Sequence, residues 1–83
     1  MTKDELIQMG RDVSDIRFMR GYVERTFEDV IAQGRASSRF RAALRDHPDP
    51  QTVADAKQAE IDQMFAWERF HNGRARQRME ARQ

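Results

Sequence analysis

Two groups of arginines have the residue type and spacing best suited to binding chemistry. The first comprises Arg35, Arg39, Arg41 and Arg45, and the second comprises Arg74, Arg76 and Arg78. The planar guanidinium can pair with two phosphate oxygens at once. Ser37 or Ser38 would start a helix at the first group, where free backbone N–H groups favour an anion. Contact with a phosphate backbone is therefore one interpretation of both groups.

The alternative interpretation is a solvated helix face on which the arginines pair with acids such as Asp46. The formal net charge is only +1, whereas dedicated nucleic-acid binders have a strong positive footprint. This balance favours the solvated face for the first group. The second group is opposed only by Glu80, but basic ends of this kind also occur simply as soluble tails.

Large apolar side chains crowd a short stretch near the second arginine group. Phe65, Trp67 and Phe70 point around more than half of a helix, so some of them must leave the core of a simple hairpin. They predict either the core of a dimer or a docking surface, in which tryptophan and arginine are the usual anchors. The residues predicted to bind a partner are Met64, Trp67, Arg69 and Phe70.

Glu68 and His71 have the Glu-x-x-His spacing that places a carboxylate and an imidazole on one helix face, as in di-iron bundles. In a dimer, Glu24 or Glu28 would supply further carboxylates. A histidine bonded to a neighbouring carboxylate is the commoner outcome, so the metal site is the lowest-ranked hypothesis and no cofactor is predicted. No activated nucleophile or glycine-rich phosphate loop is recognisable, which predicts a protein that is not an enzyme.

The composition predicts an all-α fold. The 83 residues fit a single domain, 1–83, and include 39% hydrophobic and 35% charged residues, with only two prolines and four glycines. Cysteine is absent, so neither a disulfide nor a thiolate metal site supplements the small core. No apolar run has the length of a membrane span, and the N-terminus lacks the apolar block of a signal peptide. We therefore expect no membrane contact and a cytoplasmic location.

The first helix is predicted over residues 3–33. Thr2 and Glu5 have the spacing of a capping box, and Gly34 is placed to end the helix in the left-handed conformation. Apolar residues recur at alternating steps of three and four, interrupted only by Arg20. Their members are Leu6, Met9, Val13, Ile16, Val23, Phe27 and Val30, flanked by Ile7, Met19, Tyr22 and Ile31.

Two further helical segments follow. A short connecting helix is predicted over residues 37–46, and Asp49 with Pro50 is a strong signal for the start of the next helix. That helix is predicted over residues 50–72, where Asn72 and Gly73 would end it, or to residue 81. In the first case residues 74–83 form a basic tail.

Together these segments predict a long antiparallel helical hairpin with a short connecting helix. Its apolar faces exceed what one hairpin can hide, which predicts a homo-oligomer: a dimeric four-helix bundle by preference, or a higher ring. The leading functional hypothesis is a non-enzymatic adaptor or regulator that self-associates and binds another protein. The alternative is a nucleic-acid-associated accessory protein, for example in phage DNA packaging or regulation.

Overall fold

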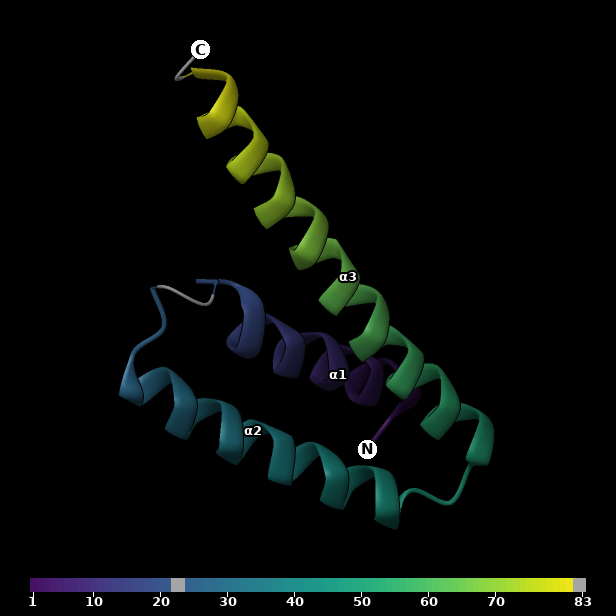
Figure 1. Ribbon diagram of the computed structural model, residues 1–83. Helices are drawn as coiled ribbons and strands as arrows, with labels where there is room; N and C mark the ends of the chain where they lie inside the picture. Colours follow the sequence, from purple (N-terminus) through teal and green to yellow (C-terminus); the bar gives the residue numbers. More distant parts are fainter. Residues whose placement is uncertain (22–23, 82–83) are drawn as a thin grey trace.

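The computed structural model describes residues 1–21 and 24–81 and contains three helices within them. These are α1 (Lys3–Phe18), α2 (Phe27–Asp46) and α3 (Pro50–Ala81) (Figure 1). No strand occurs in this part of the chain, so the predicted all-α class is confirmed. None of the described helices combines the length and apolarity required to cross a bilayer.

The predicted helix over residues 3–33 is wrong, because the chain turns between Phe18 and Phe27. Gly21 in this turn has a φ of 74°, in the left-handed region that favours glycine. Thr26 then starts α2 with a second capping box, in which its side chain accepts from the backbone N–H of Asp29 and Asp29 accepts from that of Thr26.

α2 joins two segments that the sequence analysis separated. It unites the end of the predicted first helix with the whole predicted connecting helix, residues 37–46. Gly34, predicted to end a helix, lies inside α2 with no atom near the position of its missing Cβ. The apolar stripe predicted for one helix is consequently divided between α1 and α2. Its members Tyr22 and Val23 lie outside the described residues.

α3 begins at the predicted cap. The carboxylate of Asp49 accepts from the backbone N–H groups of Gln51 and Thr52 and, over 2.6 Å, from the Thr52 hydroxyl. The helix continues through Asn72 and Gly73 to Ala81, so the longer of the two predicted ends is correct and residues 74–81 are not a separate tail. Arg82 and Gln83 lie outside the described residues. The predicted pair of long helices is thus replaced by helices of 16, 20 and 32 residues.

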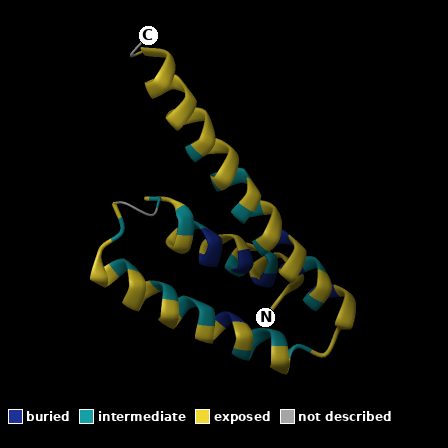
Figure 2. Ribbon diagram, in the orientation of Figure 1, coloured by how far each residue is buried: buried dark blue, intermediate teal, exposed yellow. Residues whose placement is uncertain are grey.

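The helices form a flat arrangement of 54 × 26 × 13 Å. α1 contacts both other helices: α2 runs antiparallel to it, while α3 crosses it and then projects away from the rest (Figure 1). A small core of Leu6, Val13, Phe40 and Ala56 lies where the three helices meet. Figure 2 shows that the fully buried residues gather near this region and that the last turns of α3 are exposed.

α1 and α3 approach most closely at small side chains. A Cβ atom at Gly10 would lie 2.6 Å from the carbonyl oxygen of Ala56 and 3.0 Å from Cζ of Phe40. One turn later, the buried hydroxyl of Ser14 donates to the carbonyl oxygen of Glu60 over 2.6 Å. Small residues therefore allow α1 and α3 to lie close together here, and beyond this crossing α3 projects away from α1 (Figure 1).

Candidate functional site

A row of polar contacts holds the last turns of α1 against α3. Gln63 Nε2 and Trp67 Nε1 both donate to Oδ1 of Asp15, each over 2.7 Å. One turn further along α3, His71 Nε2 lies 2.6 Å from the carbonyl oxygen of Phe18. Because a carbonyl oxygen only accepts, Nε2 must be the protonated ring nitrogen. Steps of four residues along α3 keep these three donors on one face.

The aromatic stretch predicted as a partner surface is divided by this arrangement. Trp67 and Met64 are half-buried within their own chain, whereas Arg69 and Phe70 are exposed. Trp67 packs edge-on against Phe70 with ring centroids 5.5 Å apart, and it stacks on His71. The structure therefore places Trp67 in an intramolecular contact and leaves Phe70 and Arg69 at the surface.

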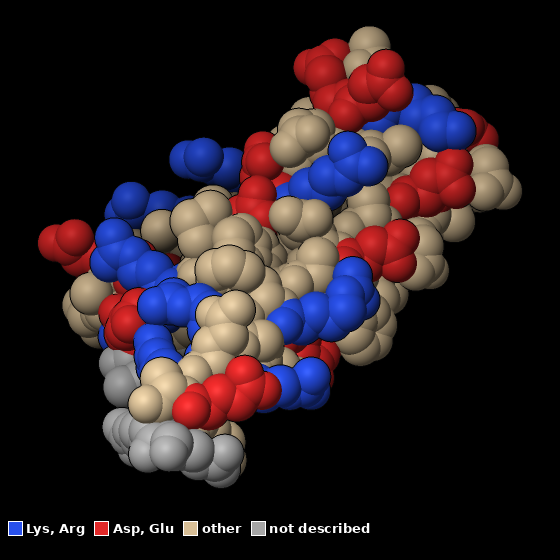
Figure 3. All heavy atoms as spheres, turned by 90° about the horizontal axis from the view of Figure 1, so that it is seen from above, with Lys and Arg blue, Asp and Glu red and all other residues tan. Residues whose placement is uncertain are grey.

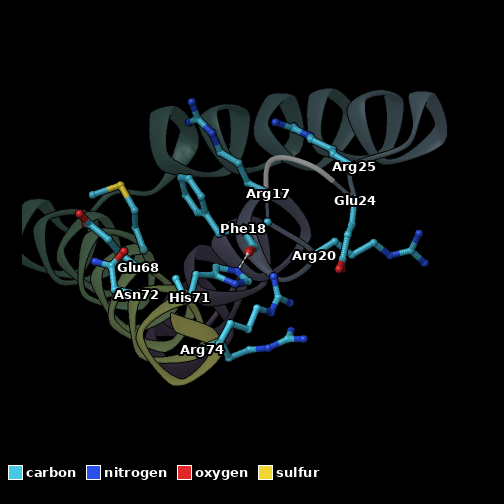
Figure 4. Close-up of a pocket in the computed structure, with 13 residues that line it drawn as sticks. Arg17, Phe18, Arg20, Glu24, Arg25, Glu68, His71, Asn72 and Arg74 are labelled. Atoms are coloured by element: carbon cyan, nitrogen blue, oxygen red, sulfur yellow. Dashed lines mark hydrogen bonds between the residues drawn. The ribbon is translucent and has the colours of Figure 1, made fainter. Parts of the chain in front are cut away.

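Beyond the polar row, a cleft of about 520 Å³ lies between the end of α1, the α1–α2 connection and the second half of α3 (Figure 4). Phe18 and Met64 contribute apolar surface to it. Arg74 extends from α3 beside His71, and Glu24 and Arg25 come from the connection (Figure 4). Its arginines are Arg17, Arg20, Arg25, Arg74 and Arg78.

Positive charge predominates in this arginine cleft. Its five arginines face two carboxylates, Glu24 and Glu68. Arg20 forms an ion pair with Asp29 at 3.4 Å, and within the described residues none of the other four forms one. The buried Nε atom of Arg25 has no hydrogen-bond partner in the same part of the chain. Seen from above, basic side chains gather at the left-hand end of the molecule beside a band of uncharged side chains (Figure 3).

Of the arginines predicted to contact phosphate, Arg74 and Arg78 line the cleft. Arg76 does not line it, and the first arginine group, exposed along α2, lies outside it. That first group consists of Arg35, Arg39, Arg41 and Arg45. Arg17, Arg20 and Arg25 also line the cleft, although the sequence did not predict them as site residues. The available signal was Arg20, a charge at an apolar position of the predicted stripe and next to a glycine.

Glu68 and His71, the residues of the lowest-ranked metal hypothesis, both line the cleft. Nε2 of His71 is occupied by its bond to the Phe18 carbonyl oxygen. Among residues 1–21 and 24–81, no three histidine, aspartate or glutamate side chains lie close enough together to hold a metal ion.

A second surface lies on α2. Phe27 and Ile31 are exposed, at 78% and 41%. Gly34 and Ser38 continue the same line at steps of three and four residues, on the side of the helix opposite the buried Phe40. We call these four residues the α2 stripe. The acids Glu28 and Asp29 lie in the first turn of α2, and its four arginines lie between residues 35 and 45.

A third surface is the projecting end of α3. Every residue from 72 to 81 is exposed, including Met79 at 67% (Figure 2). Isolated helical segments of this length are marginal in water. Because all of its residues are exposed, this end of α3 offers contact area to a partner.

Comparisons of the chain with models of protein families, with curated proteins and with solved structures give no match.

Proposed function

We propose that the protein is a non-enzymatic helical adaptor that forms a two-fold homodimer through the α2 stripe and binds another protein along α3. The observation that carries this proposal is the exposed area. The chain exposes 6407 Å². A folded monomer of its mass, 9.8 kDa, exposes only about 5,200 Å².

The excess of about 1,200 Å² exceeds the roughly 800 Å² that each partner buries in a standard protein interface. Part of it is apolar, because ten large hydrophobic side chains of the described residues are at least 40% exposed. Phe27 and Ile31 lie one turn apart on the α2 stripe, and contiguous exposed apolar surface generally marks an interaction site. A second copy is the occupant that the α2 stripe fits best.

The distribution of charge along α2 supports antiparallel pairing of two α2 helices. Residues 27–34 contain two acids and no basic residue, whereas residues 35–46 contain four arginines and one acid. A two-fold axis perpendicular to α2 would place the acidic half of one copy beside the basic half of the other. Gly34 and Ser38 have small side chains, which allow the two helices to approach closely.

In such a dimer the second half of α3 would remain free on each subunit. Phe70 and Arg69 are exposed there, and both residue types are favoured as anchors in protein interfaces. Each subunit would thus present one arm to a partner protein. Nothing in this role requires catalysis.

Sedimentation equilibrium over a wide range of protein concentrations tests the assembly. We expect a dimer for the native chain and a monomer for Ile31→Glu, because a carboxylate in the α2 stripe would be desolvated without a partner. Phe65→Glu on α3 is the matched control, since Phe65 is equally exposed, at 46% against 41% for Ile31. A monomeric native chain, or dissociation by the control alone, would contradict the proposal.

A further inference from the structure

The geometry of the arginine cleft points to a ligand that carries two or more phosphate groups. This inference is independent of dimerisation, because none of the residues of the α2 stripe lines the cleft. A volume of about 520 Å³ lies within the range of small-molecule sites. The guanidinium donors around the cleft define the chemistry of this ligand.

The donors favour phosphate over other anions. A guanidinium offers several N–H groups in one plane and matches the oxygens of a phosphate better than a single point charge does. Arg17, Arg25 and Arg74 are free of ion pairs in the described chain, so their donors are available. The buried and unpartnered Nε of Arg25 adds a donor for which a ligand oxygen is a suitable acceptor.

The number of these arginines, and the different segments from which they come, favour several phosphate groups over one. They come from three segments that line the cleft: the end of α1, the connection and the second half of α3 (Figure 4). With Arg20 paired to Asp29, the other four arginines against two glutamates leave two uncompensated positive charges. One inorganic phosphate has few oxygens to share among these donors, whereas a chain of phosphates offers acceptors to more of them.

The rest of the lining suits an apolar or aromatic group attached to the phosphates. Phe18 and Met64 provide apolar contacts, and the stems of the arginines add more. Gly21 keeps the backbone against His71, with its missing Cβ only 3.4 Å from Cε1 of the imidazole. A phosphate chain with a base attached occurs both in a free nucleotide and in a nucleic-acid strand, and these two sources share the same chemistry.

The single tryptophan provides a direct assay. Trp67 stacks on His71, which lines the cleft, so ligand binding should change the fluorescence of the native chain. We would titrate the protein at low salt with tripolyphosphate, with adenosine triphosphate and with a short single-stranded oligonucleotide. We expect saturable binding that weakens as salt rises, because charged contacts dominate.

Matched variants locate the site. Arg74→Gln and Arg25→Gln should each weaken binding by about tenfold, since each removes a charged donor from the phosphates. Arg41→Gln on α2 is the control and should change the affinity by less than about twofold. Circular dichroism verifies that each variant is folded.

The three ligands distinguish the two sources. Comparable affinity for tripolyphosphate and adenosine triphosphate identifies a free polyphosphate or nucleotide, whereas much tighter binding of the oligonucleotide identifies a strand. Either pattern supports the inference when the cleft variants are the ones that weaken binding. Absence of saturable binding to all three ligands would overturn it, as would equal weakening by Arg41→Gln.

Discussion

The backbone of α1 comes so close to α3 at Gly10 that a Cβ atom there would lie 2.6 Å from the carbonyl oxygen of Ala56. Alanine favours helix over glycine by about 1 kcal/mol, but here the backbone of α3 would have to move. We expect Gly10→Ala to lower the free energy of unfolding by about 1–3 kcal/mol, the usual cost of overpacking. Urea denaturation followed by circular dichroism measures it.

Gly73→Ala is the control for that experiment. Gly73 lies within α3 and no atom lies within 4 Å of its missing Cβ. The propensity term should therefore act alone and raise stability by about 0.5–1 kcal/mol. If Gly10→Ala stabilised the protein as Gly73→Ala should, the close crossing of α1 and α3 would be refuted.

A second residue-level prediction concerns Trp67, whose indole N–H donates to Asp15 over 2.7 Å. Trp67→Phe keeps an aromatic ring but removes this donor from a charged acceptor. We expect a loss of about 1–3 kcal/mol in the free energy of unfolding. In an Asp15→Asn background the same substitution should cost less, because the charge is already absent. Equal costs in both backgrounds would show that the charge of Asp15 contributes nothing to this contact.

At the level of helices, the connection between α1 and α2 shows that apolar periodicity alone does not reveal where one helix ends and the next begins. Apart from Arg20, the apolar spacing in the sequence continues from Ile16 to Phe27, although α1 ends at Phe18 and α2 begins at Phe27. Local signals decided otherwise: Gly21 adopts a positive φ, and Thr26 with Asp29 repeats the capping box of Thr2 with Glu5. Capping chemistry was therefore the better guide to helix boundaries.

The cleft was less predictable than the helices. Arg74 and Arg78 were recognisable as a basic cluster, but their meeting with Arg17 and Arg25 depends on the angle at which α3 crosses α1. The close contact of the two helices involves Gly10 and Ser14, which do not contribute to the apolar pattern. The contact between the Trp67 indole and Asp15 could not be predicted either, because it joins residues 52 positions apart in the sequence.

The helix starts also make stability dependent on pH. Hydrogen bonds from Thr2, Thr26 and Thr52 lower the pKa of Glu5 below 4.5 and the pKa values of Asp29 and Asp49 below 3.8, their ordinary values. In each case the folded state binds protons less readily than the unfolded state. Their contribution is therefore complete above the ordinary values and is lost as the pH falls through the lowered ones.

We accordingly expect the melting temperature to fall as the pH is lowered below about 4. Thermal denaturation at a series of pH values, followed by circular dichroism, measures this dependence. The double variant Glu5→Gln and Asp29→Asn removes two of the three titrating caps and should show a shallower dependence. A variant with the full dependence of the native chain would contradict this assignment.

For the molecule as a whole, the flat shape leaves one face of α2 uncovered, and this is the surface that assembly would bury. With a thickness of 13 Å along its shortest axis, the described part of the chain has no second layer of helices to cover α2. Its small core lies where the three helices meet, and the α2 stripe faces away from that core. A second copy placed there would form the missing layer and would leave the arginine cleft open, since the two surfaces share no residue.

The absence of cysteine allows this arrangement to be tested by crosslinking. Two antiparallel α2 helices that meet at their stripes would bring Gly34 of each copy close to the two-fold axis. We expect Gly34→Cys to form a disulfide-linked dimer readily under mild oxidation, because the Cα atoms of bridged residues lie about 5–6 Å apart. Gly73→Cys is the matched control, since both glycines are exposed, helical and without neighbours within 4 Å. It should remain monomeric on a non-reducing gel. Crosslinking at equal rates in the two variants would indicate random collision and would exclude α2 as the dimer interface.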